Sequence, residues 1–400
     1  MLIGIVGKPS SGKSTFFKAA TLIDVAIASY PFTTIKPNFG TGFVRVECVD
    51  KEFKTQCNPK YGYCINHIRF VPVELIDVAG LVPGAHEGKG LGNQFLNDLS
   101  AAHVLIHVID LSGSINEKGE AVTPFSYDPA NDIRFLEHEI DMWFTGILKR
   151  GWDKFARQMQ QNTTTIEKAL ATQLSSFRVT EALVKSTIEK LNLGNEPPTK
   201  WTDEQLKSLA TEFRKATKPI VIACNKADVP GSEKNFERLK KEFPEYMLVP
   251  CSSESEVALK EAAKKKMIDY APGDKKFEII EPDKLNANQK KALEFIEKNV
   301  LGKWGSTGVQ ECLDKAVFEF LKYIAIFPAG VNKLADKDGN ILPDCHLMPP
   351  GSTALDFAYK IHTDFGKNFL YAMDAKTKMK IGGDKKLKNR DAIEIISAAR

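Results

Sequence analysis

The sequence predicts an α/β fold in which a doubly wound, mostly parallel sheet carries an inserted helical segment and is followed by a small β module. Short apolar runs rich in β-branched residues alternate with helical periodicity in the first part of the chain, a pattern typical of parallel sheets covered by helices. A long helical stretch interrupts the alternation, and the end of the chain changes to short strands and turns. A chain of 400 residues exceeds what one hydrophobic core usually serves, so we expect about two to three domains.

The composition is that of a packed globular protein. Hydrophobic residues make up 43% and charged residues 26% of the chain, close to globular averages. No apolar run reaches the length of a membrane span and the first residues show no signal-peptide pattern, so we expect neither membrane insertion nor secretion. Seven cysteines, an odd number, favour reduced thiols and a cytoplasmic location. The net charge of +4 allows an anionic partner such as RNA.

A phosphate-binding loop is predicted at the amino terminus. Residues 2–6 are an apolar, β-branched run, followed at once by a glycine-bounded loop and a helical pattern. The spacing fits G-x-x-x-x-G-K-[ST], in which backbone N–H groups and a helix N-terminus surround phosphate oxygens. Lys13 would hold the β and γ phosphates, and Ser14 would ligate Mg²⁺. The residues expected to bind the nucleotide here are Gly7, Lys8, Pro9, Ser10, Ser11, Gly12, Lys13, Ser14 and Thr15.

A base-recognition motif follows another strand pattern. Residues 220–223 lead into Asn225, Lys226 and Asp228, a match to N-K-x-D. The carboxylate of Asp228 could accept the ring N1–H and the exocyclic amine of guanine, whereas adenine offers no such donor pair, so the motif favours GTP over ATP. Lys226 would cover the base plane. After the strand pattern at 248–250, backbone N–H groups of small residues could reach guanine O6; these residues are Cys251, Ser252 and Ser253.

Two further segments would respond to the third phosphate. Residues 71–76 are rich in β-branched residues and lead into Asp77 of a D-x-x-G pattern. Asp77 would orient a Mg²⁺-bound water, and Gly80 would offer its N–H to the γ-phosphate. A proline-bracketed loop contains Thr33 and Thr34, whose hydroxyls could reach Mg²⁺ once γ-phosphate is bound. Thr34 is the favoured ligand of the two.

These motifs resemble those of the Obg-type GTPases, and most closely those of the YchF (Obg-like ATPase) branch. The resemblance is carried by G-K-P-S-S-G-K-S-T at 7–15, Y-P-F-T-T-I-K-P-N at 30–38 and D-V-A-G-L-V-P-G-A-H-E-G-K-G-L-G-N-Q-F-L at 77–96. It extends in pieces over nearly the whole chain. It implies a Ras-like P-loop nucleotide domain, an inserted helical segment and a carboxyl-terminal TGS domain of β-grasp type. It also implies work at the ribosome or in translation.

The chain departs from that branch in its base motif. YchF proteins typically prefer ATP and carry a degenerate base-specificity motif, whereas N-K-x-D is intact here. We therefore expect GTP as the substrate, GDP and phosphate as products, and Mg²⁺ as the cofactor. An Obg-like ATPase is the alternative, and it would require Asp228 to lie away from the base.

The group that activates water is less well defined. Leu81 follows the D-x-x-G pattern directly, where Ras-type enzymes place the glutamine that orients the attacking water, so we expect slow intrinsic hydrolysis. Another side chain or a partner must then help to activate the water. The local candidates are His86 and Glu87, although both could equally be solvated loop residues. The residues assigned to catalysis are Lys13, Thr34, Gly80, His86 and Glu87, the last two being these candidates. A different alternative is an RNA-binding or ribosome-binding adaptor with negligible hydrolysis.

Four parts are expected along the chain. The nucleotide domain comprises residues 1–131 and 217–282 and is interrupted at 132–216 by a helical, coiled-coil-like hairpin. This arm could bind a partner, or its apolar stripe could simply pack on itself. A helical connector at 283–326 leads to the TGS domain at 327–400. We expect the arm and the TGS domain to contact the ribosome or RNA.

Two remaining patterns concern metal and RNA. Cys57, Cys64 and His67 could share an ion, but zinc usually takes four ligands with closer cysteine spacing. We therefore expect these residues to form a turn joining two strands before Asp77. Seven basic residues lie between positions 376 and 390 with one acid among them, and they could neutralise RNA phosphates. A solvated lysine-rich loop is the alternative.

Overall fold

The computed structural model describes residues 1–22, 38–78, 98–161 and 165–398. They form two compact units, the first made of Met1–Ser14 and Ile76–Leu248 and the second of Thr15–Leu75 and Val249–Arg400. Among the described residues, no helix combines the length and the apolar character needed to cross a bilayer.

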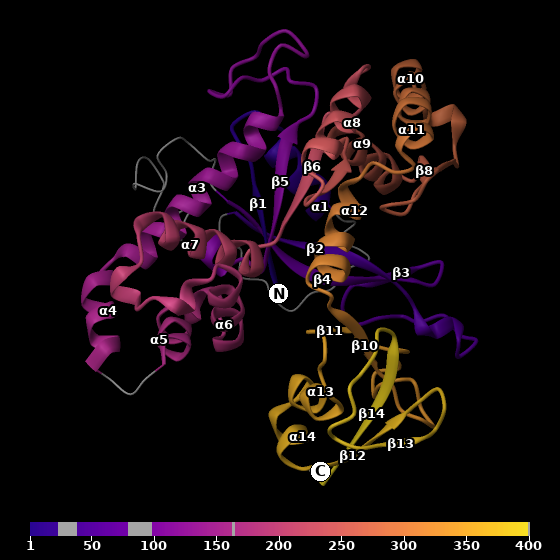
Figure 1. Cartoon of the computed structure of the whole chain (residues 1–400). Coiled ribbons are helices and arrows are strands. Elements are labelled where there is room, and N and C mark those ends of the chain that lie inside the picture. The colour runs from indigo at the N-terminus through magenta and orange to yellow at the C-terminus, as the bar shows by residue number, and fades with distance from the viewer. Residues whose placement is uncertain (23–37, 79–97, 162–164, 399–400) are drawn as a thin grey trace. The chain divides into compact units, whose positions relative to one another are not determined.

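Three parallel strands form the centre of the first unit (Figure 1). They are β1 (Leu2–Val6), β5 (Val104–Asp110) and β6 (Ile220–Asn225), and β5 lies between the other two. Every residue of β5 and β6 is buried, which explains why these strands are continuous apolar runs rather than alternating patterns. Because the strands are parallel, their carboxyl ends meet at one edge, where ligands bind in open α/β sheets.

Among the described residues between β5 and β6, five α-helices are present, and the predicted inserted helical region is therefore present. Its two longest helices, α3 and α7, pack against each other, and three shorter helices lie between them in sequence. The apolar residues of α3 that recur at spacings of three and four are buried, as an amphipathic helix requires. The helices are α3 (Ala130–Lys149), α4 (Trp152–Gln161), α5 (Ile166–Gln173), α6 (Glu181–Lys190) and α7 (Asp203–Thr217). After β6 the unit continues with α8 (Ser232–Glu242) and the start of β7 (Met247–Pro250).

Helix α1 and strand β4 each belong to both units. Helix α1 (Lys13–Thr21) begins in the first unit, and β4 (Ile68–Asp77) ends there. In the second unit, β4 pairs in antiparallel fashion with β3 (Tyr63–Ile65). A turn joins the two strands at residues 66–67, whose φ angles are positive. Of the three residues expected to form it, only His67 lies in this turn, because Cys64 belongs to β3 and Cys57 to the preceding loop. Strand β2 (Phe39–Glu47) precedes this hairpin.

Helices dominate the next part of the second unit. Residues of α9 and α10 form an apolar cluster with Ile268 of β8 (Ile268–Asp269), which pairs with β9 (Glu278–Ile279). Two of the helices continue into π-helical turns, at Glu297–Leu301 and Lys315–Phe320. The helices are α9 (Ser253–Lys264), α10 (Ala287–Ile296), α11 (Gly302–Trp304) and α12 (Val309–Asp314).

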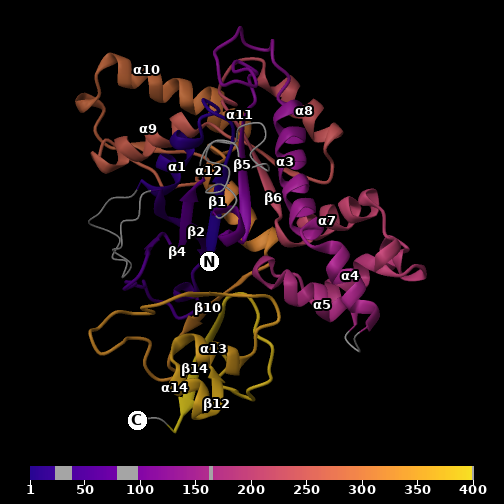
Figure 2. The same cartoon turned by 90° about the vertical axis from the view of Figure 1, so that its left-hand side faces the viewer.

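The chain ends in a five-stranded module with two short helices (Figure 2). Its strand order is β11-β10-β14-β12-β13; β10 and β14 are parallel and the other neighbours antiparallel. Apolar residues from the sheet and from α13 form one cluster. The elements are β10 (Ile324–Pro328), β11 (His346–Met348), α13 (Ala354–Ile361), α14 (Thr363–Lys367), β12 (Phe369–Asp374), β13 (Lys380–Ile381) and β14 (Asp391–Ser397).

Candidate nucleotide site

The loop between β1 and α1 has the backbone of a phosphate cradle. Ser10 and Gly12 have φ angles of 63° and 92°, a region that glycine adopts without strain. A β carbon on Gly12 would collide with Nδ2 of Asn225, and one on Gly7 would collide with the carbonyl oxygen of Val108. Both glycines are therefore required by close packing, and the loop is tied to the edge of the parallel strands.

Lys13 and Asp77 form an ion pair between Nζ and Oδ1. The backbone N–H of Val78 donates to the carbonyl of Ile5 at 3.0 Å, which brings the end of β4 beside β1. The lysine and aspartate side chains are 13% and 19% exposed, so both retain contact with solvent. The structure thus places the lysine predicted for phosphate next to the carboxylate predicted for Mg²⁺.

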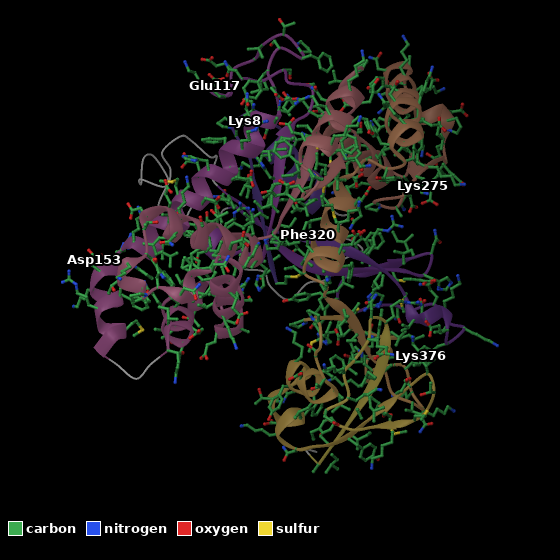
Figure 3. All side chains as sticks on the ribbon, viewed as in Figure 1. Lys8, Glu117, Asp153, Lys275, Phe320 and Lys376 are labelled. Carbon is green, nitrogen blue, oxygen red and sulfur yellow. The ribbon has the colours of Figure 1, made fainter. Side chains whose placement is uncertain are left out.

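The side chain of Lys8, labelled in Figure 3, makes contacts that the sequence motif did not predict. It is buried, its Nζ lies 2.9 Å from Oδ2 of Asp132 and donates to the carbonyl of Ile115 at 2.8 Å, and it sits 3.8 Å from the ring centre of Tyr127. Burial raises the pKa of Asp132 to about 6, although Lys8 favours its charged form. The side chain of Lys8 therefore holds the start of α3, and only its backbone N–H could face a phosphate. Sequence spacing could not show this direction.

The first residue of the N-K-x-D motif fastens the phosphate loop. Asn225, the last residue of β6, donates from Nδ2 to the carbonyl of Ser11 at 3.0 Å, and both groups are buried. Asp228 follows in a half-buried position. The motif and the loop therefore form one arrangement in the first unit, as parallel strands with a common carboxyl edge require.

Lys226 is held by residues that the sequence motifs did not identify. Its Nζ donates to Oδ2 of Asp110 at 3.1 Å and to Oγ of Ser114 at 3.2 Å, and its φ is 61°. Asp110 is fully buried at the end of β5, where Ser112 and Ser114 also donate to it. A polar residue ending a buried strand is the signal that could have identified Asp110.

The residues expected near guanine O6 lie in the second unit, after β7 and up to the first residue of α9. The N–H of Ser252 donates to the carbonyl of Thr307 at 2.9 Å, and its hydroxyl donates to Oγ of Ser255 at 2.7 Å. Sγ of Cys251 lies 3.5 Å from Sγ of Cys312. The Ser252 N–H is thus engaged inside this unit, and the expected role of these residues toward guanine O6 stays a prediction.

Part of the predicted site falls outside the described residues. This applies to Thr33, Thr34, Gly80, Leu81, His86 and Glu87. Within the described part, Ser14 is exposed on the first turn of α1 and Asp77 keeps access to solvent. A hydroxyl and a carboxylate are the oxygen donors that Mg²⁺ takes in phosphate sites, so these two residues fit the ion by their chemistry.

Three protein families match successive parts of the chain. Residues 2–137 match the family described as 50S ribosome-binding GTPase, and residues 223–330 match the Obg-like GTPase YGR210-like, G4 motif-containing domain. Residues 335–397 match the TGS domain. The first two matches lie on either side of helices α4 to α7, and the third covers most of the terminal β module.

Matches that cover the whole chain are also GTP-binding proteins. An uncharacterised GTP-binding protein of Methanocaldococcus jannaschii is 49% identical over 400 residues, which covers all of both chains. The crystal structure of a GTP-binding protein from Pyrococcus horikoshii covers all of both chains at 39% identity with a TM-score of 0.78. The ribosome-binding ATPase YchF of Mycoplasma genitalium is 30% identical over 222 residues, covering 56% of this chain and 55% of its own.

Proposed function

Because the chain belongs to the YchF family of Obg-like P-loop GTPases and ends in a TGS domain, we propose that it binds GTP and hydrolyses it to GDP and phosphate as a Mg²⁺-dependent switch. One observation carries most of the proposal: the N-K-x-D asparagine is hydrogen-bonded to the phosphate loop. A nucleotide that reaches from that loop to Asp228 would therefore meet phosphate-binding and guanine-reading groups of fixed spacing.

The pair of Lys13 and Asp77 supplies a switch at the phosphates. Phosphate oxygens carry more charge than one carboxylate, so Lys13 would turn to the β and γ phosphates and release Asp77. Asp77 and the hydroxyl of Ser14 would then hold Mg²⁺, with Thr33 or Thr34 joining them when γ-phosphate is present. The ion supplies charge neutralisation at the phosphate oxygens. The N–H of Gly80 would report the third phosphate.

Guanine preference rests on Asp228 and on the fixed position of Lys226. A carboxylate that accepts two hydrogen bonds from guanine would be left unpaired by adenine, which costs about 1–3 kcal/mol for a desolvated group. Lys226 is anchored at its Nζ by Asp110 and Ser114, so its aliphatic stem is available to cover the base. The names of several relatives specify ATPases instead, and ATP is therefore the second candidate substrate.

Competition binding tests the substrate. A fluorescent guanine nucleotide bound to the full chain with Mg²⁺ is displaced by unlabelled GTP, GDP, ATP or ADP. We expect GTP and GDP to displace it at concentrations at least about tenfold lower than ATP and ADP. Displacement by ATP at equal or lower concentration would favour the Obg-like ATPase.

A turnover measurement tests the reaction. Leu81 cannot polarise water, so hydrolysis by the isolated chain is expected to be slow, with His86, Glu87 or a partner assisting. Phosphate release is measured in single turnover with and without ribosomes. Acceleration by ribosomes would support a ribosome-coupled switch working in the cytoplasm, whereas GTP binding with no detectable phosphate release in either case would favour the adaptor without hydrolysis.

A further inference from the structure

Three thiols and a carboxylate gather at the segment joining β2 to the β3–β4 hairpin. The ligating atoms of Cys48, Asp50, Cys57 and Cys64 all lie within 4.8 Å of one another. Sγ of Cys48 is 3.6 Å from Sγ of Cys57, and Sγ of Cys64 is 3.8 Å from Oδ2 of Asp50. In the parts of the chain that the structure describes, no other group of three or more potential ligating side chains converges in this way.

The local fold explains why residues so far apart in sequence converge. Cys48 follows the last residue of β2, Cys64 lies in β3, and the intervening loop returns between them. Oδ2 of Asp50 accepts the backbone N–H of Cys57 at 3.0 Å, which closes the loop onto its own first turn. Oδ1 of the same carboxylate lies 2.9 Å from Nδ1 of His67. Asp50 is thus fixed from both sides, with one oxygen directed at the thiols.

The spacing of these atoms matches a tetrahedral metal site. Zinc binds thiolate sulfur at about 2.3 Å, so two sulfurs on one tetrahedral ion lie about 3.8 Å apart. The observed separation of Cys48 and Cys57 is close to this edge. Cys48 and Asp50 are fully buried and Cys57 nearly so, as in closed structural sites. We propose that Cys48, Asp50, Cys57 and Cys64 bind one structural zinc ion through three thiolates and one carboxylate.

The surrounding charges suit this ligand set. Three thiolates and a carboxylate carry four negative charges, of which zinc neutralises two. The buried guanidinium of Arg69 lies with Nη1 3.5 Å from Sγ of Cys57 and offsets a third. His67 then serves as the outer partner that orients the carboxylate, a common feature of metal sites. On binding, three S–H bonds break, three S–Zn bonds form and three protons leave to solvent, without any oxidation.

The zinc loop, residues 48–64, also supports the segment that leads into β11. The N–H of Lys60 donates to the carbonyl of Pro343 at 2.9 Å, and Nη1 of Arg69 donates to the carbonyl of Leu342 at 3.0 Å. A metal ion that fixes this loop would therefore also fix Leu342 and Pro343, which lie between β10 and β11 of the terminal module.

Metal content and cobalt spectroscopy test the site on the full-length chain. The reduced protein, freed of metal by a chelator and reloaded with zinc, is expected to retain one zinc per chain after desalting. Loaded with Co²⁺ instead, it should show sulfur-to-cobalt charge-transfer absorption and visible bands of a tetrahedral ion. Cys64→Ser should weaken zinc retention and reduce the charge-transfer band, and His67→Ala should lower zinc affinity about 10–100-fold.

Cys312→Ser is the matched control, because Cys312 is buried and lies 3.5 Å from another thiol but belongs to no larger ligand group in the described residues. It should retain zinc and the full cobalt spectrum. If Cys64→Ser fails to fold, the wild-type cobalt spectrum decides alone. Substoichiometric zinc with no charge-transfer band would overturn the proposal. So would a disulfide between Cys48 and Cys57 under the same reducing conditions, or zinc binding unchanged in Cys64→Ser.

Discussion

At the residue scale, Asn225 connects the base-recognition motif to the phosphate loop. Its side-chain amide reaches the buried carbonyl of Ser11, and Gly12 leaves the space that this contact needs. A small change at this position therefore acts on the loop that holds phosphate rather than on the base. Asp228 belongs to the same motif but is expected to act on the base, because its carboxylate would distinguish guanine from adenine.

Substitutions of Asn225 and Asp228 should therefore have different effects on stability and on nucleotide binding. Asn225→Ala leaves a buried carbonyl without its donor, so we expect the free energy of unfolding to fall by about 1–3 kcal/mol and GTP and ATP to bind more weakly by a similar factor. Asp228→Ala should weaken GTP by about tenfold or more while ATP binding and stability change little. Denaturant unfolding and competition binding measure both effects. Equal losses of GTP and ATP in Asp228→Ala would show that Asp228 does not read the base.

Lys13 provides a second prediction at this scale. Lys13→Ala removes the charge expected at the phosphates, so nucleotide affinity should drop by at least about tenfold. Lys18→Ala, on the same helix, removes only an exposed pair with Glu261 and should leave affinity unchanged, because surface pairs contribute little. Titration with a fluorescent nucleotide compares the two variants. Tight binding by Lys13→Ala would contradict the assignment of the phosphate loop.

At the element scale, the junction between α7 and β6 contains a buried lysine. Lys218 donates from Nζ to the carbonyls of Ser100 and Ala102, both at 2.7 Å. Burial, together with the charge of Arg178, lowers the pKa of Lys218 to about 7. The unfolded chain would hold its proton up to the ordinary value of 10.5. Between these two pH values the unfolded state therefore binds more protons than the folded state.

This difference in bound protons sets the direction in which the free energy of unfolding changes with pH. The free energy of unfolding should rise as pH increases from about 7 towards 10, by up to about 1.4 kcal/mol per pH unit from this group. Lys218→Met should lower stability overall, because two buried carbonyls lose their donor, and should remove this slope. Urea unfolding from pH 7 to 9.5 for both proteins measures it. Parallel curves would mean that Lys218 keeps its ordinary pKa in the folded chain.

Periodicity and spacing predicted the elements best where one local pattern decided the structure. The bounds of β1 agree with the apolar run at residues 2–6, and N-K-x-D begins at Asn225, the last residue of β6. The convergence of Cys48 and Asp50 with Cys57 and Cys64 was not predicted, because eight residues separate Cys48 from Cys57 and six separate Cys57 from Cys64. Only the return of the loop onto β3 brings them together. The side-chain direction of Lys8 was likewise set by tertiary contacts that no spacing records.

At the scale of the whole molecule, the terminal module offers fewer basic side chains for binding RNA phosphates than its sequence suggested. Lys376, which is labelled in Figure 3, pairs with Glu52 at 2.7 Å, and Arg390 pairs with Glu47 and Glu52 at 3.0 and 2.8 Å. These two cations therefore contribute to holding the module within its unit. The five basic residues that stay exposed are Lys378, Lys380, Lys385, Lys386 and Lys388.

Those lysines should govern RNA affinity if the module contacts RNA. The double substitution Lys385→Glu and Lys386→Glu should weaken binding to ribosomal RNA and reduce the salt dependence of the affinity, because fewer counterions are released. The same charge change at Lys240 and Lys241, which are exposed on α8, is the control and should have a smaller effect. Filter binding across a series of KCl concentrations measures both. Equal effects of the two pairs would indicate net charge alone rather than a binding surface.

The ion pair of Lys8 with Asp132 connects the first turn of α3 directly to the phosphate loop. A partner that binds the helical arm and displaces the first turn of α3 must strain or break this buried ion pair. The displacement would therefore also move the predicted phosphate loop. If the proposed function holds, such a partner would change the affinity for nucleotide. Thermodynamic reciprocity then requires that nucleotide changes the partner's affinity by the same factor by which the partner changes nucleotide affinity.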